Sequence, residues 1–229
     1  MVNTDSTSNK ALRRKRTMRY FIEAASDILN NEGIDSLTTR NVAAKAGYNS
    51  ATIYNYFGNF ERLIAFAAIK GLKDYAFDLQ KQINDEMSPV EKYIKIWLCY
   101  FKHSLKNPVV FSILFQQYGN NPLVFLQEYY DIFPEELQDL PKDIHETFFE
   151  SDFDVRNRLL LNKGVEVGLF KVEDVDSIVD MSQFIFEGVL VEARKSTERY
   201  NINVFLKYLK RVLLAFNPDL KETLDAIRV

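Results

Sequence analysis

Residues 38–57, TTRNVAAKAGYNSATIYNYF, contain the pattern of a short helix, a glycine turn and a second short helix. Thr38 is suited to cap the first helix, because its hydroxyl can accept a hydrogen bond from a free backbone N–H of the first turn. Gly47 is the residue best able to take the left-handed conformation that ends a helix, and Asn49 can cap the next helix. Small or apolar side chains predict that the two helices cross closely; they are Val42, Ala43, Ala46, Ile53 and Phe57.

The second of these helices leaves its polar side chains free to face outward. These side chains belong to Ser50, Thr52, Tyr54, Asn55 and Tyr56. A helix-turn-helix that contacts nucleic acid needs this layout, with a packed first helix and hydrogen-bonding groups exposed on the second. From periodicity alone, an ordinary pair of core helices in an all-α protein is an equally good interpretation.

The longer stretch from Gly33 to Leu63 resembles the DNA-binding domain of the TetR family of bacterial one-component repressors. The matching pieces, in order, are Gly33, Leu37–Arg40, Val42-Ala43, Ala46-Gly47, Thr52–Tyr54, Tyr56-Phe57 and Glu61-x-Leu63. So many matches over about 30 residues make a strong signal, although the stretch covers only the first third of the chain.

The resemblance implies which side chains of the motif meet DNA. Those nearest base edges or the thymine methyl would be Ser50, Ala51, Thr52 and Tyr56, and those contacting phosphate would be Thr39, Arg40 and Tyr54. Tyr48, Asn49 and Phe60 depart from the family pattern. We include Tyr48 and Asn49 among the DNA-binding residues. Phe60 stands where the family often has a phosphate-binding lysine, so we expect no phosphate contact from this side chain. Packing between helices is the alternative role for both Tyr54 and Tyr56.

Composition indicates an all-α chain that works in a reducing compartment. Hydrophobic residues make up 47% of the 229 residues and charged residues 27%, with only 8 Gly and 6 Pro, and no long alternating strand pattern occurs. The single cysteine, Cys99, rules out an internal disulfide and fits the cytoplasm. His103 and His145 do not form a metal-ligand spacing, so we expect no metal and no cofactor. No apolar stretch is long enough to span a bilayer.

Charge is distributed unevenly along the chain. Residues 1–75 have a balance of +4 and residues 76–229 a balance of −7, and six basic residues lie between Lys10 and Arg19. Such asymmetry is typical of a DNA-binding head on an acidic body. We therefore predict a disordered tail over 1–10, a helix-turn-helix domain over 11–75, and a helical ligand-binding and dimerisation domain over 76–229. One long connector helix, from about Asn59 to Ile83, would join the two domains.

The body is rich in aromatic residues, since residues 97–153 hold 13 of the 31 in the chain. A plain aromatic core is one explanation, and a ligand pocket with a few polar groups is the other; the resemblance favours the pocket. Its candidate lining residues are Trp97, Phe101, Phe111, Phe115, Tyr118, Phe125, Tyr129, Phe149 and Phe153. Residues 128–154 carry 10 acids and one lysine, which indicates either a solvated loop or a pocket mouth that attracts cations.

The last two long helices have extensive apolar faces that predict a four-helix dimer interface. The candidate residues are Ile178, Ile185, Val189, Phe205, Leu209 and Val212. Packing in the core of one protomer is the alternative.

Together these features predict a homodimeric, ligand-responsive transcriptional regulator. We expect a repressor that leaves a palindromic double-stranded DNA operator when a small apolar or aromatic effector binds. It would be cytoplasmic, with no membrane partner. An architectural or division-related DNA binder without an effector is the main alternative. An enzyme and a helical scaffold are further alternatives, and the absence of a phosphate-cradling glycine loop argues against the enzyme.

Overall fold

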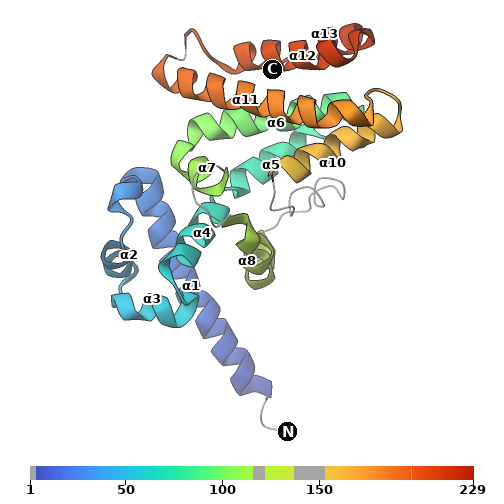
Figure 1. Cartoon of the computed structure of the whole chain (residues 1–229). Helices are drawn as coiled ribbons and strands as arrows, with labels where there is room; N and C mark the ends of the chain where they lie inside the picture. The colour runs from blue at the N-terminus through green and yellow to red at the C-terminus, as the bar shows by residue number, and fades with distance from the viewer. Residues whose placement is uncertain (1–3, 116–121, 137–152, 197) are drawn as a thin grey trace. The chain divides into compact units, whose positions relative to one another are not determined.

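The chain folds into helices throughout the part that the computed structural model describes, which is residues 4–115, 122–136, 153–196 and 198–229 (Figure 1). The all-α fold class is confirmed. The chain divides into two compact units. Unit 1 comprises Met1–Lys73 and Val109–Leu137, and unit 2 comprises Asp74–Pro108 and Gln138–Val229. The chain therefore passes between the units three times.

Unit 1 contains the predicted helix-turn-helix and a later segment that packs with it. Its elements are α1 (Thr4–Asn31), η1 (Ile34–Ser36), α2 (Thr39–Ala46), α3 (Ser50–Phe57), α4 (Phe60–Lys70), α7 (Pro108–Phe115), η2 (Pro122–Phe125), α8 (Leu126–Ile132) and η3 (Pro134–Glu136). Buried aromatic rings link these helices, with the Phe57 ring 6.2 Å from Phe21 and 5.8 Å from Phe66. Phe66 in turn meets Tyr129 of α8 edge-on at 5.4 Å, so α8 belongs to the core of this unit.

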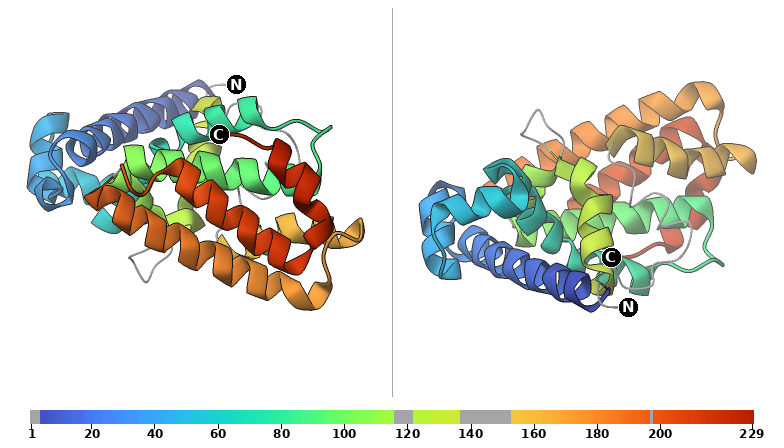
Figure 2. Two further views of the ribbon diagram at one scale, coloured as in Figure 1. Left: turned by 90° about the horizontal axis from the view of Figure 1, so that it is seen from above. Right: turned by 90° about the horizontal axis from the view of Figure 1, so that it is seen from below.

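Unit 2 is a bundle of longer helices. Its elements are α5 (Lys73–Gln82), α6 (Pro89–Lys106), α10 (Phe153–Glu166), η4 (Val172–Asp174), α11 (Val175–Lys195), α12 (Ile202–Phe216), η5 (Pro218–Leu220) and α13 (Lys221–Ala226). Helices α11 and α12 run side by side and pack on α6 (Figures 1 and 2). At their centre Trp97 of α6 lies between Phe186 and Phe205, with ring centroids 5.3 and 6.0 Å away.

Two predicted boundaries differ from the structure. Helix α1 begins at Thr4, so it includes most of the residues predicted as a disordered tail. The predicted connector helix consists of two helices, α4 and α5, and the chain passes from unit 1 to unit 2 where they meet. A Cβ atom at Gly71 would lie 2.9 Å from the Val110 side chain, so any other residue at this break would require Val110 of α7 to shift.

Candidate nucleic-acid interface

Side-chain caps and a left-handed glycine form the helix-turn-helix as the sequence predicts. The Thr38 hydroxyl accepts a hydrogen bond from the backbone N–H of Asn41 at 3.2 Å. Gly47 ends α2 with φ at +79°. The Asn49 side chain then accepts from the backbone N–H of Thr52 at 3.0 Å and caps α3. Ile53 and Phe57 are fully buried, so the opposite face of α3 is the one left to meet a ligand.

The predicted DNA-binding residues differ in how far they reach the surface. Exposed side chains belong to Arg40, Tyr48, Asn49, Ala51 and Tyr54, while Thr39, Ser50, Thr52 and Tyr56 are half-buried. Tyr54 is 50% exposed, which leaves its hydroxyl available to an outside partner. Arg40 makes no ion pair with the described part of the chain.

Several of these side chains also contact the rest of the head. The Tyr48 ring packs 5.1 Å from Phe21, and the Tyr56 ring lies 6.4 Å from the same residue. The Thr52 hydroxyl donates to the Asn49 side chain at 2.9 Å, and the Ser50 hydroxyl donates to the Thr39 carbonyl at 3.5 Å. Packing between helices, the alternative for Tyr56, therefore applies to it at least in part.

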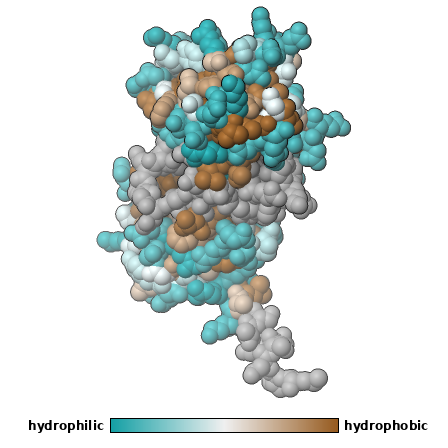
Figure 3. All heavy atoms as spheres, turned by 45° about the vertical axis from the view of Figure 1, so that its right-hand side comes forward, coloured by the Kyte–Doolittle hydropathy of each residue, from teal (hydrophilic) through white to brown (hydrophobic). Residues whose placement is uncertain are grey.

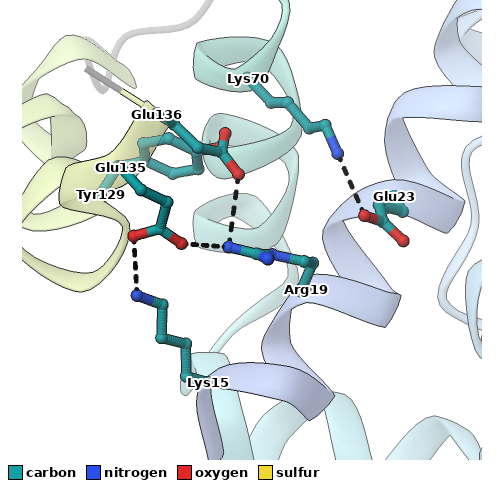
Figure 4. A network of polar contacts seen from close by, with 7 residues as sticks. All are labelled: Lys15, Arg19, Glu23, Lys70, Tyr129, Glu135 and Glu136. Atoms are coloured by element: carbon teal, nitrogen blue, oxygen red, sulfur yellow. Dashed lines mark hydrogen bonds and ion pairs between the residues drawn. The ribbon is translucent and has the colours of Figure 1, made fainter. Parts of the chain in front are cut away.

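The basic segment of α1 is partly neutralised by acids of η3 (Figure 4). Lys15 pairs with Glu135 at 2.9 Å, and Arg19 pairs with both Glu135 and Glu136. The hydrogen bond from Lys15 holds the pKa of the Glu135 carboxyl at about 2, below its usual range. The pairing joins residues more than 100 positions apart, which the local charge pattern did not reveal.

Other cations of the head are paired as well. Lys45 of α2 pairs with Asp27 and Glu32 of α1. These two carboxylates raise the pKa of the Lys45 ammonium above its usual value. Lys70 of α4 pairs with Glu23 at 3.5 Å. A phosphate would therefore have to compete with carboxylates for each of these side chains.

The predicted pocket residues fall into both units. Trp97 and Phe101 are buried in unit 2, whereas Phe111, Phe125 and Tyr129 belong to unit 1, where Phe111 and Tyr129 are buried. The Tyr129 hydroxyl donates to Glu136 at 2.5 Å. Tyr118 and Phe149 lie outside the described residues, as does most of the acidic stretch 128–154, and the structure describes only the backbone of Phe115 and Phe153.

The predicted dimer residues lie in the core of unit 2, which favours the alternative of packing within one protomer. Five of the six are buried within the protomer, namely Ile178, Val189, Phe205, Leu209 and Val212, and the sixth, Ile185, is half-buried. Both faces of α11 carry apolar side chains, and periodicity alone cannot tell which one faces inward. The outer face of α11 holds Met181, Phe184, Gly188 and Val191, all exposed.

No group of three or more His, Cys, Asp or Glu side chains in the described part of the chain is arranged to hold a metal ion. None of its helices is both long and apolar enough to cross a membrane.

These features define a helix-turn-helix protein with a DNA-binding head. Residues 21–65 match the model of bacterial regulatory proteins of the tetR family. The chain is 23% identical over 194 residues to the HTH-type transcriptional regulator SAB2452 of Staphylococcus aureus (strain bovine RF122 / ET3-1), covering 82% of this chain and 92% of the relative. Residues 21–65 thus match a TetR-type DNA-binding domain, and the chain is similar over most of its length to a transcriptional regulator.

Solved structures share this fold. RolR in complex with resorcinol has a TM-score of 0.56 at 16% identity, over 95% of this chain and 97% of that one. SmeT in complex with triclosan has a TM-score of 0.52 at 16% identity, over 88% and 91%. At such low identity these likenesses concern the fold alone.

Proposed function

We propose that this protein is a homodimeric repressor of the TetR family that binds a palindromic operator and leaves it when a small aromatic effector binds. The observation that carries the proposal is the outer face of α3, which is uncharged and exposed. Asn49 caps the N-terminus of this helix. In the proposal this face enters the major groove and reads bases.

The residues proposed to contact DNA divide by chemistry. Arg40 and Tyr54, both exposed, would donate to phosphate oxygens, and Thr39 in the first turn of α2 would do so together with free backbone N–H groups. Ala51 and the methyl group of Thr52 suit contact with a thymine methyl. Tyr48, Asn49, Ser50 and Tyr56 complete the proposed surface, with Ser50 and Tyr56 also serving to pack the head.

The exposed stripe on α11 supports the dimer. Met181, Phe184, Gly188 and Val191 follow each other at spacings of three, four and three residues, so they lie in one line along the helix. Apolar residues also reach the surface of unit 2 among hydrophilic ones in the space-filling view (Figure 3). A two-fold axis through this stripe would pair α11 with its copy, and two heads could then read half-sites about 34 Å apart.

The aromatic centre of unit 2 supports an effector of aromatic character. Trp97, Phe186 and Phe205 gather there, and the Tyr93 and Ser182 side chains beside them are buried. The Tyr93 hydroxyl interacts with the Ser182 and Trp97 side chains. A phenolic or hydroxylated ligand would find its polar partners among these groups. The resorcinol complex of RolR provides a precedent within the same fold.

Binding to DNA upstream of the protein's own gene is the direct test. We expect a specific complex in a gel-shift assay, weakened by Arg40→Ala on all sequences roughly equally, with the salt dependence reduced by about one unit of slope. Resorcinol and triclosan are suitable first probes of release. No specific complex there or on flanking promoters would refute local repression. Binding that no small molecule releases would instead support a DNA binder without an effector.

A further inference from the structure

We infer that Arg14 and Arg62 position the recognition helix α3 by holding its C-terminal end, and that Glu128 of α8 orients one of these two arginines. The inference builds on the proposed DNA-binding function. It assigns to Arg14, which lies in the basic segment of α1, a role within the head.

The carbonyl groups that end α3 carry the inference. The last four carbonyls of a helix have no partner within the helix, and in α3 these belong to residues 54–57. The first of them, on Tyr54, accepts from the backbone N–H of Gly58 at 2.9 Å. Arg14 donates to the carbonyls of Asn55 and Tyr56 at 3.3 and 2.8 Å, and Arg62 donates to that of Phe57 at 3.1 Å. All four carbonyls thus have a donor.

The charges of these donors suit the helix end. Helix α3 carries no acidic residue in its first turn and no basic residue in its last, so neighbouring helices supply the cations that favour its negative pole. Each guanidinium also lies over an aromatic ring, that of Arg14 at 5.1 Å from the Tyr56 centroid and that of Arg62 at 5.5 Å from the Phe66 centroid. A planar guanidinium can bond two carbonyls and stack at once, which an ammonium cannot do.

The two ends of α3 are therefore fixed by different elements. At the N-terminal end, Asn49 caps the helix and the Ser50 hydroxyl reaches the Thr39 carbonyl. At the C-terminal end, Arg14 ties the helix to α1 and Arg62 ties it to α4. Fixing both ends sets the tilt of α3. In the proposed complex this tilt determines how deeply each of its side chains reaches into the major groove. Losing one end should reduce discrimination between sequences more than it reduces general attraction to DNA.

Glu128 links α8 to these contacts at the C-terminal end of α3. Its carboxylate forms an ion pair with the guanidinium of Arg62, and both groups belong to unit 1. Arg62 Nε is buried and has no hydrogen-bond partner among the described residues, so Glu128 and the Phe57 carbonyl provide the polar contacts that orient the side chain. A displacement of α8 would therefore act on the end of the recognition helix through one guanidinium.

The test compares Arg14→Gln with Arg16→Gln, which removes an exposed cation from the same helix. Binding to the operator and to a scrambled duplex would be measured by fluorescence anisotropy over a range of KCl concentrations. We expect Arg14→Gln to weaken operator binding roughly tenfold, as for one hydrogen bond to a charged group, while the salt slope stays unchanged and the preference for the operator falls. Glu128→Gln, which retains both arginines, should produce a smaller change of the same kind.

Hydrogen exchange gives a readout that needs no DNA. In the free protein, Arg14→Gln should speed amide exchange within residues 50–58, whereas Arg16→Gln should leave it unchanged. A salt slope that falls by about one with the preference intact would show a phosphate contact and overturn the inference. Unchanged exchange in both Arg14→Gln and Glu128→Gln would overturn it too. Failure of the wild-type protein to bind any operator would refute the proposed function. The exchange result would still test whether Arg14 and Glu128 help to hold the C-terminal end of α3.

Discussion

The exposed stripe on α11 allows a quantitative prediction about dimerisation. Phe184 is 68% exposed in the protomer. Complete burial of such a side chain contributes up to about 3 kcal/mol, so roughly 2 kcal/mol per copy is available to an interface. Because a two-fold interface contains both copies, Phe184→Ala should cost about 3 kcal/mol once the retained Cβ is allowed for, which corresponds to roughly a hundredfold rise in the dimer dissociation constant.

A second change in the stripe separates association from folding. A Cβ atom at Gly188 would meet no atom within 4 Å in the protomer, and replacing a mid-helix glycine generally stabilises a helix by up to about 1 kcal/mol. Gly188→Leu should therefore leave the folded protomer intact or more stable. In the proposed dimer the added side chain would separate the two copies of α11, so the variant should dissociate at concentrations at which the wild-type protein is dimeric.

Sedimentation velocity over a concentration series measures both effects, and thermal unfolding checks that each variant is folded. Val172 is a matched control, because it is apolar and 74% exposed but belongs to η4 and lies outside the stripe on α11. Val172→Ala should leave the dissociation constant unchanged. The reasoning is refuted if Phe184→Ala and Gly188→Leu dimerise as tightly as the wild type, or if the wild type is monomeric throughout.

Three further predictions concern single side chains. Glu135→Gln removes the carboxylate that holds two cations of α1, so non-specific DNA binding should strengthen severalfold with a steeper salt slope in anisotropy titrations; unchanged slope would contradict it. Burial lowers the pKa of His103 below its ordinary value despite the Asp78 carboxylate at 2.9 Å, so stability should be fully present above about pH 6.5 and fall as pH drops below it. His103→Gln should flatten that dependence in thermal melts recorded from pH 5 to 7.5. Gly71→Ala should lower the melting temperature by several degrees, because its Cβ would meet Val110; an unchanged melting temperature would show that the side chain can move aside.

Local chemistry made much of the head predictable from sequence. Thr38 and Asn49 each cap the helix that follows, as their positions indicated, and Asn59 and Ser88 do the same for α4 and α6. Caps depend on a side chain and a backbone N–H only a few residues apart, so short-range sequence contains the whole interaction. The family resemblance then identified the motif as a DNA-binding one.

Interactions between distant residues were beyond that reasoning. Arg14 lies 42 positions from the carbonyl of Tyr56 and Arg62 lies 66 positions from Glu128, and nothing in the local pattern links them. The sequence also could not separate the inner face of α11 from its outer face, because apolar side chains on two sides of a helix give no single direction to the periodicity. Helix α13 was not predicted at all, since its six residues are too few for a helical pattern to stand out.

The pairing of cations within the head has a consequence for how the protein would find its site. Five of the basic side chains in unit 1 are engaged by carboxylates, namely those of Lys15, Arg19, Lys45, Arg62 and Lys70, and Arg14 is engaged by carbonyls. Non-specific affinity depends on cations available to phosphate, so a single head should hold arbitrary DNA weakly. An uncharged α3 adds contacts only where the bases fit it. Two heads would then have to act together for stable binding, and the exposed stripe that would join them becomes as necessary to recognition as the helix that reads the groove.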